Sequence, residues 1–480
     1  MMYLFVTGLF SILGQVVLLR ELNVAFYGIE LIYILALGIW LLCSGVGSLI
    51  SGRVMSPSPL RVRVLLLTLS VLLPLDVAFV RAIRPLFSPA PGAYLPFHLQ
   101  IASMALALLP VGLLLGLLFQ WSARIYIGGR RTLALAYAIE SAGGLAGGLL
   151  ATLFLRFGVQ NLTAAIICSW LSLGAAFVSP LAAGGRALRA ALAALAAVLA
   201  GISWQVSALD RWMTSWNHPD LLAVRDSPYS RLTLTQLGEQ VALFENDELS
   251  FETQGTAAEE FVHLAALQHP QPGRVLMMGG GVEGSVRELL QHPVRSVDYV
   301  ELNRAVLDDL LPTLSQETSD SLKDSRVRIY IADPRRFLEE VAGYDLILVG
   351  MPEPTSGQAN RFYTREFFAL CRARMNPGGI VALRLRSAEN LWTPQLARRT
   401  ASIYRAMKSA FPHVLTLPGT MNVMIGSLEP MAAAPSILSA RFESRSIRAR
   451  LVSPRYIEYV YTNDRFAQVA ERLEREPAPV

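Results

Sequence analysis

The sequence predicts two structural parts: an N-terminal polytopic α-helical bundle and a C-terminal α/β domain with a small β unit before it. One observation is compositional. Of the 480 residues, 53% are hydrophobic and 16% are charged, and the apolar excess falls in the first 210 residues. This is too apolar for an ordinary soluble protein. The other observation is the segment Arg274–Glu301, where a strand, a glycine turn, a helix and a second strand follow one another.

Seven apolar stretches in the first part are long enough to span a bilayer. They cover residues 3–24, 31–52, 63–83, 99–121, 132–155, 160–182 and 187–208. The first lacks a basic start and a small-residue cleavage site, so we interpret it as a span and not as a signal peptide. Pairs of glycines four residues apart, such as Gly112 and Gly116, allow close helix packing in lipid.

A few polar residues fall within these spans, where hydrocarbon penalises them. They are Gln15, Arg20, Glu21 and Glu140. A transporter or proton path would use such groups. The alternative, which we favour, is that Arg20 and Glu21 lie at the membrane interface and that Glu140 pairs with an arginine inside the bundle.

The arginines between the spans bear on orientation. The loops after spans two, four and six hold eight, against five on the other side. The positive-inside rule would then leave everything after Trp212 outside the cytoplasm. Because this conflicts with a domain suited to a cytosolic metabolite, the side of the second part stays open.

The glycine segment has the features of a nucleotide site. The apolar strand Val275–Met278 leads directly into Gly279, Gly280 and Gly281, and the second strand, Val297–Val300, ends at Glu301. Glycines let a backbone approach a ligand, and an acid about 20 residues further on accepts hydrogen bonds from ribose hydroxyls. The alternative is a tight turn without a ligand, but three consecutive glycines cost stability for no packing gain.

The remaining elements complete an α/β pattern with four regions. We divide the chain into a membrane domain (1–208), a linker (209–222) and β unit to residue 255, a Rossmann-like domain (256–430) and a mixed extension (431–480). Strands are expected within 230–253 and at 327–331, 345–349, 380–385, 413–417 and 421–425; helices are expected at 257–268, 303–311, 335–341, 364–374, 394–410 and 464–474. Ligands bind at the carboxyl ends of such strands. Glu301, Asp333 and Gly350–Pro354 all follow strands, so they converge on one cleft.

Two ligand classes are not expected. Cys43, Cys168 and Cys371 are far apart and form no metal spacing or disulfide framework. The net charge of +5 includes no basic run, so nucleic acid is not an expected partner.

Residues 223–465 resemble the polyamine aminopropyltransferase family, whose best-known member is spermidine synthase. The motifs are the glycine segment, VDYVELN, IADPRRFL, DLILVG and NPGG. The whole chain is similar to bacterial proteins in which this domain follows a multi-span region, as FENDELSFET, NRFYTREFF and YAIESAGGLAGG indicate. The resemblance implies a class I methyltransferase-like sheet, a multi-pass protein of the bacterial inner (cytoplasmic) membrane, and lipid, a small amine acceptor and a second copy of the chain as candidate partners.

The resemblance also implies site residues. The ligand would be decarboxylated S-adenosylmethionine or a similar nucleotide, without a metal, with Glu301 on the ribose and Asp333 on the adenine amino group. Gly279, Gly280 and Gly281 would line the nucleotide. Tyr229, Glu259, His263, Asn360 and Tyr363 are the candidates on the substrate side.

The catalytic side departs from the family pattern. Val282 and Gly350 stand where the family has aspartates, and Glu353 replaces the aspartate of an Asp-Pro pair. A polyamine is cationic at neutral pH, and only its neutral amine can attack, so the site needs a carboxylate to accept the proton. Losing one general base costs about 10²–10⁴-fold in rate. Glu283 and Glu353 are the candidate substitutes. The alternative that we favour for Glu283 is a solvated acid stabilised by a helix N-terminus.

Three functions therefore stay open. The first is an aminopropyl or related transferase with an altered acceptor. The second is a nucleotide-binding sensor or scaffold that has lost its chemistry. The third is a transporter regulated by its α/β domain.

Overall fold

A computed structural model of the chain describes residues 1–54, 56–87, 93–178, 186–388 and 392–479. The chain divides into two compact units, Met1–Leu249 and Ser250–Val480. Each unit is described by itself.

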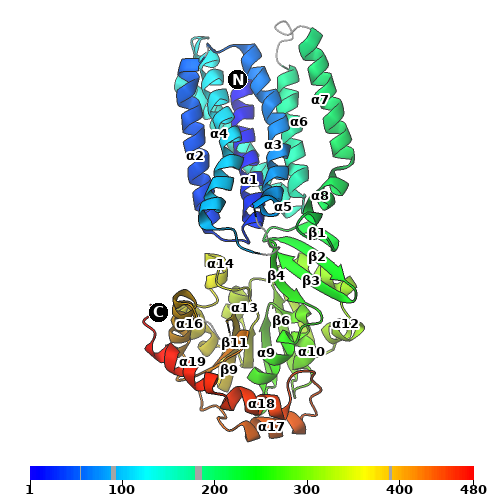
Figure 1. Cartoon of the computed structure of the whole chain (residues 1–480), viewed down its shortest axis with the longest axis vertical. Coiled ribbons are helices and arrows are strands. Elements are labelled where there is room, and N and C mark those ends of the chain that lie inside the picture. Colours follow the sequence, from blue (N-terminus) through cyan, green and yellow to red (C-terminus); the bar gives the residue numbers. More distant parts are fainter. Residues whose placement is uncertain (55, 88–92, 179–185, 389–391, 480) are drawn as a thin grey trace. The chain divides into compact units, whose positions relative to one another are not determined.

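The first unit begins with long helices that lie side by side (Figure 1). They are α1 (Met2–Ala25), α2 (Leu31–Val54), α3 (Pro59–Phe87), α4 (Phe97–Ile127), α5 (Leu133–Arg156), α6 (Asn161–Val178), α7 (Arg186–Trp204) and α8 (Val206–Ser215). Six of the described helices are long and apolar enough to cross a membrane, or seven if α7 and α8 are one span bent by 70°. The predicted helices are thus confirmed, except that the seventh is broken; residues 179–182 of the sixth prediction lie outside the described residues.

Glycines bring these helices into backbone contact. A Cβ atom on Gly143 of α5 would lie 1.9 Å from the carbonyl oxygen of Phe5 on α1, and one on Gly8 would lie 1.9 Å from that of Glu140. A Cβ atom on Gly116 of α4 would lie 2.1 Å from the carbonyl oxygen of Ser44 on α2. The glycines four residues apart therefore serve helix packing inside the unit, as predicted.

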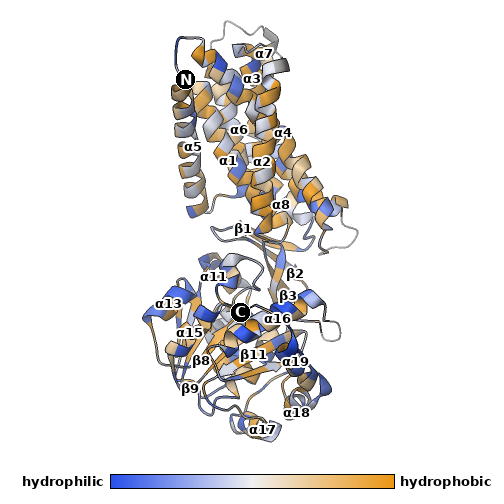
Figure 2. Ribbon diagram, turned by 90° about the vertical axis from the view of Figure 1, so that its left-hand side faces the viewer, coloured by the Kyte–Doolittle hydropathy of each residue, from blue (hydrophilic) through white to orange (hydrophobic). Residues whose placement is uncertain are grey.

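The outer faces of these helices are apolar. Hydrophobic residues, drawn in orange, are frequent along the long helices in the hydropathy view (Figure 2). On α2, Ile34, Leu41 and Leu49 are 71%, 68% and 78% exposed, and on α5 Leu145 is 68% exposed. Exposed apolar patches of this size mark surfaces that contact lipid or other proteins.

An antiparallel sheet follows the helices. Its strands are β1 (Leu221–Asp226), β2 (Arg231–Leu237), β3 (Gln240–Glu245) and β4 (Glu248–Glu252), in that order across the sheet. Gly238, Asn246 and Asp247 have positive φ angles at the turns, as their residue types predict. The linker expected over 209–222 is instead the end of α8 and the start of β1. The boundary between the units falls inside β4, so β1 to β3 belong to the helical unit.

The second unit is built on a sheet of seven strands in the order β10-β11-β9-β8-β5-β6-β7. The strands are β5 (Arg274–Met278), β6 (Ser296–Glu301), β7 (Val327–Ile331), β8 (Tyr344–Val349), β9 (Met375–Arg386), β10 (His413–Leu417) and β11 (Met421–Ser427). β5 to β9 pair in parallel and β11 is antiparallel to both its neighbours. The predicted α/β fold with a mostly parallel sheet is confirmed.

Helices surround this sheet (Figure 1). They are α9 (Ala257–Ala266), α10 (Ser285–Leu289), α11 (Arg304–Leu310), α12 (Gln316–Leu322), α13 (Pro334–Glu340), α14 (Gly357–Asn360), α15 (Arg365–Ala373), α16 (Pro394–Lys408), α17 (Pro435–Ser444), α18 (Pro454–Thr462) and α19 (Asp464–Arg475). Side chains at Asp333, Thr364 and Thr393 cap the first turns of α13, α15 and α16. The chain runs from β5 to β6 on one side and later adds β8 on the other, so the strand order reverses between β5 and β8. Ligands of such sheets bind outside the carboxyl ends of the strands at this point.

Candidate functional site

The glycine loop after β5 has a backbone that only glycine adopts without strain. Gly279 and Gly280 have φ angles of 65° and 67°. A Cβ atom on Gly281 would lie 2.6 Å from the Tyr299 ring. The three predicted glycines therefore shape a loop without side chains at the carboxyl edge of the sheet, packed against Met351 and Tyr299.

Glu301 ends the neighbouring strand β6 and is held in place by hydrogen-bond donors. The Tyr299 hydroxyl donates to Oε2 at 2.8 Å, and the Asn303 N–H donates to Oε1 at 3.0 Å. The Leu302 N–H also donates to this carboxylate, whose roughly four lone-pair sites still allow a bond from a ligand hydroxyl. Burial raises the pKa of Glu301 above 4.5, although these hydrogen bonds oppose this shift. The side chain is thus a fixed acceptor next to the glycine loop.

Asp333 follows Ala332, whose N–H donates to the Glu301 carbonyl oxygen at 3.1 Å. This hydrogen bond brings Asp333 close to the end of β6. Its Oδ1 caps α13 by accepting from the Arg335 N–H. Its Oδ2 accepts from Nη1 of Arg361 at 2.6 Å. The predicted adenine-binding acid is therefore at the same edge as Glu301 but forms an ion pair in this structure.

Glu283 closes the glycine loop and forms an ion pair with Arg384 on β9. The two side chains are 7% and 12% exposed. Burial raises the pKa of Glu283, and Arg384 partly offsets this. The favoured expectation of a solvated first-turn acid is therefore wrong, because the strand β9 provides a buried cation that the local sequence does not show.

The loop after β8 brings Gly350 and Glu353 to the glycine loop. A Cβ atom on Gly350 would lie 2.9 Å from the Gly279 carbonyl oxygen, so a side chain does not fit without a backbone shift. Oε2 of Glu353 lies 2.7 Å from Nη1 of Arg399, and the Arg386 N–H donates to Oε1. The buried Tyr363 hydroxyl donates to the carbonyl oxygens of Met351 and Pro352, which fixes this loop.

The other four candidates on the substrate side have different surroundings. Glu259 accepts from the backbone N–H groups of residues 450–452 and so anchors the C-terminal segment. His263 is fully buried, with Nδ1 at 2.9 Å from His292 and Nε2 at 3.1 Å from Glu288. Asn360 is exposed at the end of α14. Tyr229 belongs to the first unit and is 53% exposed.

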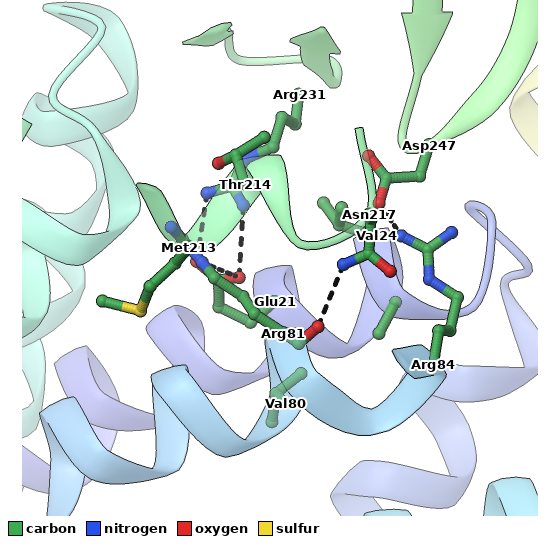
Figure 3. A pocket seen from close by; sticks show the side chains of 11 residues that line it. Glu21, Val24, Val80, Arg81, Arg84, Met213, Thr214, Asn217, Arg231 and Asp247 are labelled. Carbon is green, nitrogen blue, oxygen red and sulfur yellow. Dashed lines mark hydrogen bonds and ion pairs between the residues drawn. The ribbon is translucent and has the colours of Figure 1, made fainter. Parts of the chain in front are cut away.

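The first unit contains a buried charge cluster, defined here as Arg20, Glu21, Arg81, Asp210, Asp226 and Arg231. Arg81 donates to Glu21 and Asp210 at 2.8 Å, and Arg231 donates to Glu21 and Asp226 at 3.0 Å. The cluster holds three carboxylates and three guanidiniums and joins α1, α3, α8, β1 and β2. Figure 3 shows Glu21, Arg81 and Arg231 converging on a small pocket from different elements.

These contacts bear on the polar residues predicted within the spans. Glu21 is expected at the membrane interface, and this stays a prediction; the structure shows that it is 1% exposed and enclosed by protein. Glu140 is expected to pair with an arginine inside the bundle, and this is wrong: within the described ranges no ion pair forms at Glu140. Its own helix packs against α1 through glycines.

The arginine partners of the site acids escaped the sequence reasoning. Arg384 lies in the predicted strand 380–385 and Arg386 directly follows that strand, so a period of two residues could have placed both on one face. Tyr299 and Glu301 alternate in the same way in VDYVE.

Part of the chain matches a known protein family. The spermine/spermidine synthase domain family matches residues 256–429. A polyamine aminopropyltransferase of Korarchaeum cryptofilum is 31% identical over 163 residues, which are 32% of this chain and 49% of that protein. One of Mycobacterium tuberculosis is 28% identical over 330 residues, 64% of this chain and 62% of that protein. The chain thus spans less than two thirds of each of these relatives.

A solved spermidine synthase in complex with the transition state analogue AdoDATO aligns with 53% of this chain and 88% of its own, with 18% identity and a TM-score of 0.47. The family match covers β5 to β11, which include the glycine loop, Glu301 and Asp333. Residues 256–429 of this chain therefore form a spermine/spermidine synthase domain.

Proposed function

We propose that the chain binds an S-adenosylmethionine-type nucleotide at the carboxyl edge of its seven-stranded sheet and transfers the three-carbon chain on the sulfur to an amine. In the relatives named as polyamine aminopropyltransferases, that chain is an aminopropyl group. The ribose hydroxyls bind Glu301, the loop Gly279–Gly281 lies against the nucleoside, and the adenine amino group binds Asp333.

One observation carries this proposal. Glu301 ends β6 with both carboxylate oxygens oriented by Tyr299 and Asn303, directly beside a glycine loop with positive φ angles. A carboxylate fixed next to a glycine loop at the strand-order reversal is the arrangement that recognises a ribose. The packing of Gly281 on Tyr299, and of Tyr299 on Glu301, joins the two halves of the site.

The test is a transfer assay with the full chain in detergent. Decarboxylated or intact S-adenosylmethionine is incubated with a panel of amines, and release of methylthioadenosine is measured by mass spectrometry. The proposal is supported if methylthioadenosine is released only when an amine is present and if Glu301→Gln abolishes this release. Binding of the nucleoside without release for any amine would reject transfer.

A second candidate function is nucleotide binding without transfer. It is favoured by Gly350, which offers no carboxylate and leaves no room for one, and by Glu353, whose carboxylate is paired with Arg399. Neither group is a ready base for a cationic amine. The same assay separates the two functions, because a sensor that binds the sulfonium nucleotide releases no methylthioadenosine from it.

The proposal includes a location at the bacterial inner membrane. The support is the set of six or seven apolar helices and the exposed leucines and isoleucines of α2 and α5. Hydrocarbon is the environment in which this surface costs least. Fractionation of cells expressing the full chain tests it: carbonate-resistant membrane association is expected, and release by carbonate would reject integration.

A further inference from the structure

Arg384 places a guanidinium beside the glycine loop of the candidate site. It lies near the end of β9 and forms an ion pair with Glu283. Its guanidinium carbon is 5.6 Å from the centroid of the Phe261 ring on α9. With the side chain 12% exposed, two partners from different elements hold this cation in one place.

Most N–H donors of this guanidinium have no hydrogen-bond acceptor among the described residues. Within the described part of the chain it makes a single hydrogen bond, in which its Nη2 donates to Oε2 of Glu283. A guanidinium has five N–H donors in a planar fork, and that fork matches a carboxylate. Arg384 and Glu283 together thus offer a fixed positive and a fixed negative group to whatever lies over the loop.

The sheet order indicates which part of the nucleotide meets this pair. β6, β5, β8 and β9 are consecutive neighbours, and they end at Glu301, the glycine loop, Gly350 and Arg386. A nucleoside with its ribose on Glu301 therefore directs the chain on its sulfur across the glycine loop toward β8 and β9. Glu283 closes that loop, and Arg384 lies two residues before the end of β9.

We propose that Arg384 selects a sulfonium nucleoside whose three-carbon chain keeps its α-carboxylate, namely intact S-adenosylmethionine in preference to the decarboxylated form. The inference rests on the proposed nucleotide site. An ammonium and a carboxylate on one chain complement Glu283 and Arg384. A decarboxylated chain carries an ammonium alone, next to a guanidinium, and Val282 and Gly350 provide no further carboxylate.

This assignment changes the group that the proposed transfer would move. The lone pair of the acceptor nitrogen forms a bond to the Cγ carbon of the chain, and the Cγ–S bond breaks. The electron pair stays on sulfur, so neutral methylthioadenosine leaves, and the acceptor nitrogen gives its proton to water. The group transferred is then 3-amino-3-carboxypropyl.

The test compares three ligands by calorimetric titration of the full chain in detergent. S-adenosylmethionine, decarboxylated S-adenosylmethionine and methylthioadenosine are titrated into the wild type, Arg384→Gln and Arg384→Lys, with Arg328→Gln on the exposed face of β7 as the matched control. Hydrogen bonds to a charged group are worth roughly 10- to 100-fold in affinity. We expect the wild type to prefer intact S-adenosylmethionine by about this factor and Arg384→Gln to lose the preference.

Methylthioadenosine separates the two levels of the argument because it lacks the chain. If the wild type does not bind it, the proposed function fails, and the selection fails with it. If the wild type binds it but prefers the decarboxylated nucleotide or shows no preference, the inference about Arg384 alone is overturned. If Arg384→Gln also loses binding of methylthioadenosine, its loss of S-adenosylmethionine binding says nothing specific about the chain. The ligand preference of the wild type and that of Arg384→Lys, which keeps the charge, then decide whether the inference holds.

Discussion

Replacing Arg231 by methionine tests the buried charge cluster of the first unit. Arg231 donates to Oε1 and Oε2 of Glu21 at 3.0 and 3.2 Å, and to both oxygens of Asp226 at 3.0 and 3.1 Å. It is 3% exposed. Burial by itself would raise the pKa of Asp226, but Arg231 outweighs burial and lowers it. Methionine keeps the apolar stem and removes the charge, which leaves Glu21 and Asp226 short of one partner.

The cost follows from the charge balance. The cluster changes from three carboxylates and three guanidiniums to three and two. Removing one partner of a buried ion pair costs about 3–5 kcal/mol, a large part of a typical folding free energy of about 5–15 kcal/mol. For a unit of this size, the unfolding midpoint should fall by roughly 6–20 °C.

Tryptophan fluorescence during heating in detergent is a suitable assay. Trp392 is the single tryptophan of the second unit, and the other six fall within residues 1–249. Arg156→Met, at the exposed end of α5, is the matched control and should change stability by about 0.5 kcal/mol or less. Asp226→Asn combined with Arg231→Met should cost less than the two single changes added together. A loss below about 1 kcal/mol for Arg231→Met would refute the claim that the cluster is paired as described.

Four further predictions follow from the structure. Burial raises the pKa of Glu301 above 4.5. Lowering the pH through that raised pKa protonates Glu301, which should weaken nucleotide affinity in titrations and, at the same time, increase this group's contribution to folding stability. Glu301→Gln should lack both trends. Gly350→Asp should lower the melting temperature by an amount equal to about 1–3 kcal/mol, because its Cβ meets Gly279; an unchanged melting temperature would contradict this contact. Tyr363→Phe should cost about 1 kcal/mol in the same assay through the lost hydroxyl contacts. A fragment of residues 209–480 lacks Glu21 and Arg81, so limited proteolysis should cut its β1–β3 region much faster than in the full chain.

The sequence predicted features that are set locally. The strand Val275–Met278, its glycines and the acid after β6 follow from periodicity and turn chemistry, and the structure has all three at one edge. The apolar helices follow from composition alone. Such features depend on neighbours within a few residues, which a single sequence displays.

Features set by distant partners were missed. The residues around Glu283 in the sequence predict a solvated acid, because its partner Arg384 is 101 residues away and does not appear among them. Glu21 and Arg231 are 210 residues apart, so nothing in the sequence near either residue reveals their contact. For the same reason Glu259 matches a substrate-side motif, yet its carboxylate binds a backbone segment near residue 451.

The most direct measurement of the central claim is a calorimetric titration of the full chain with methylthioadenosine, the nucleoside common to both sulfonium nucleotides. The claim is that Glu301 and the glycine loop form a nucleoside site. We expect saturable binding to the wild type, its loss in Glu301→Ala, and its persistence in Arg328→Gln. Absence of binding to the wild type, or equal binding to Glu301→Ala, would contradict the claim.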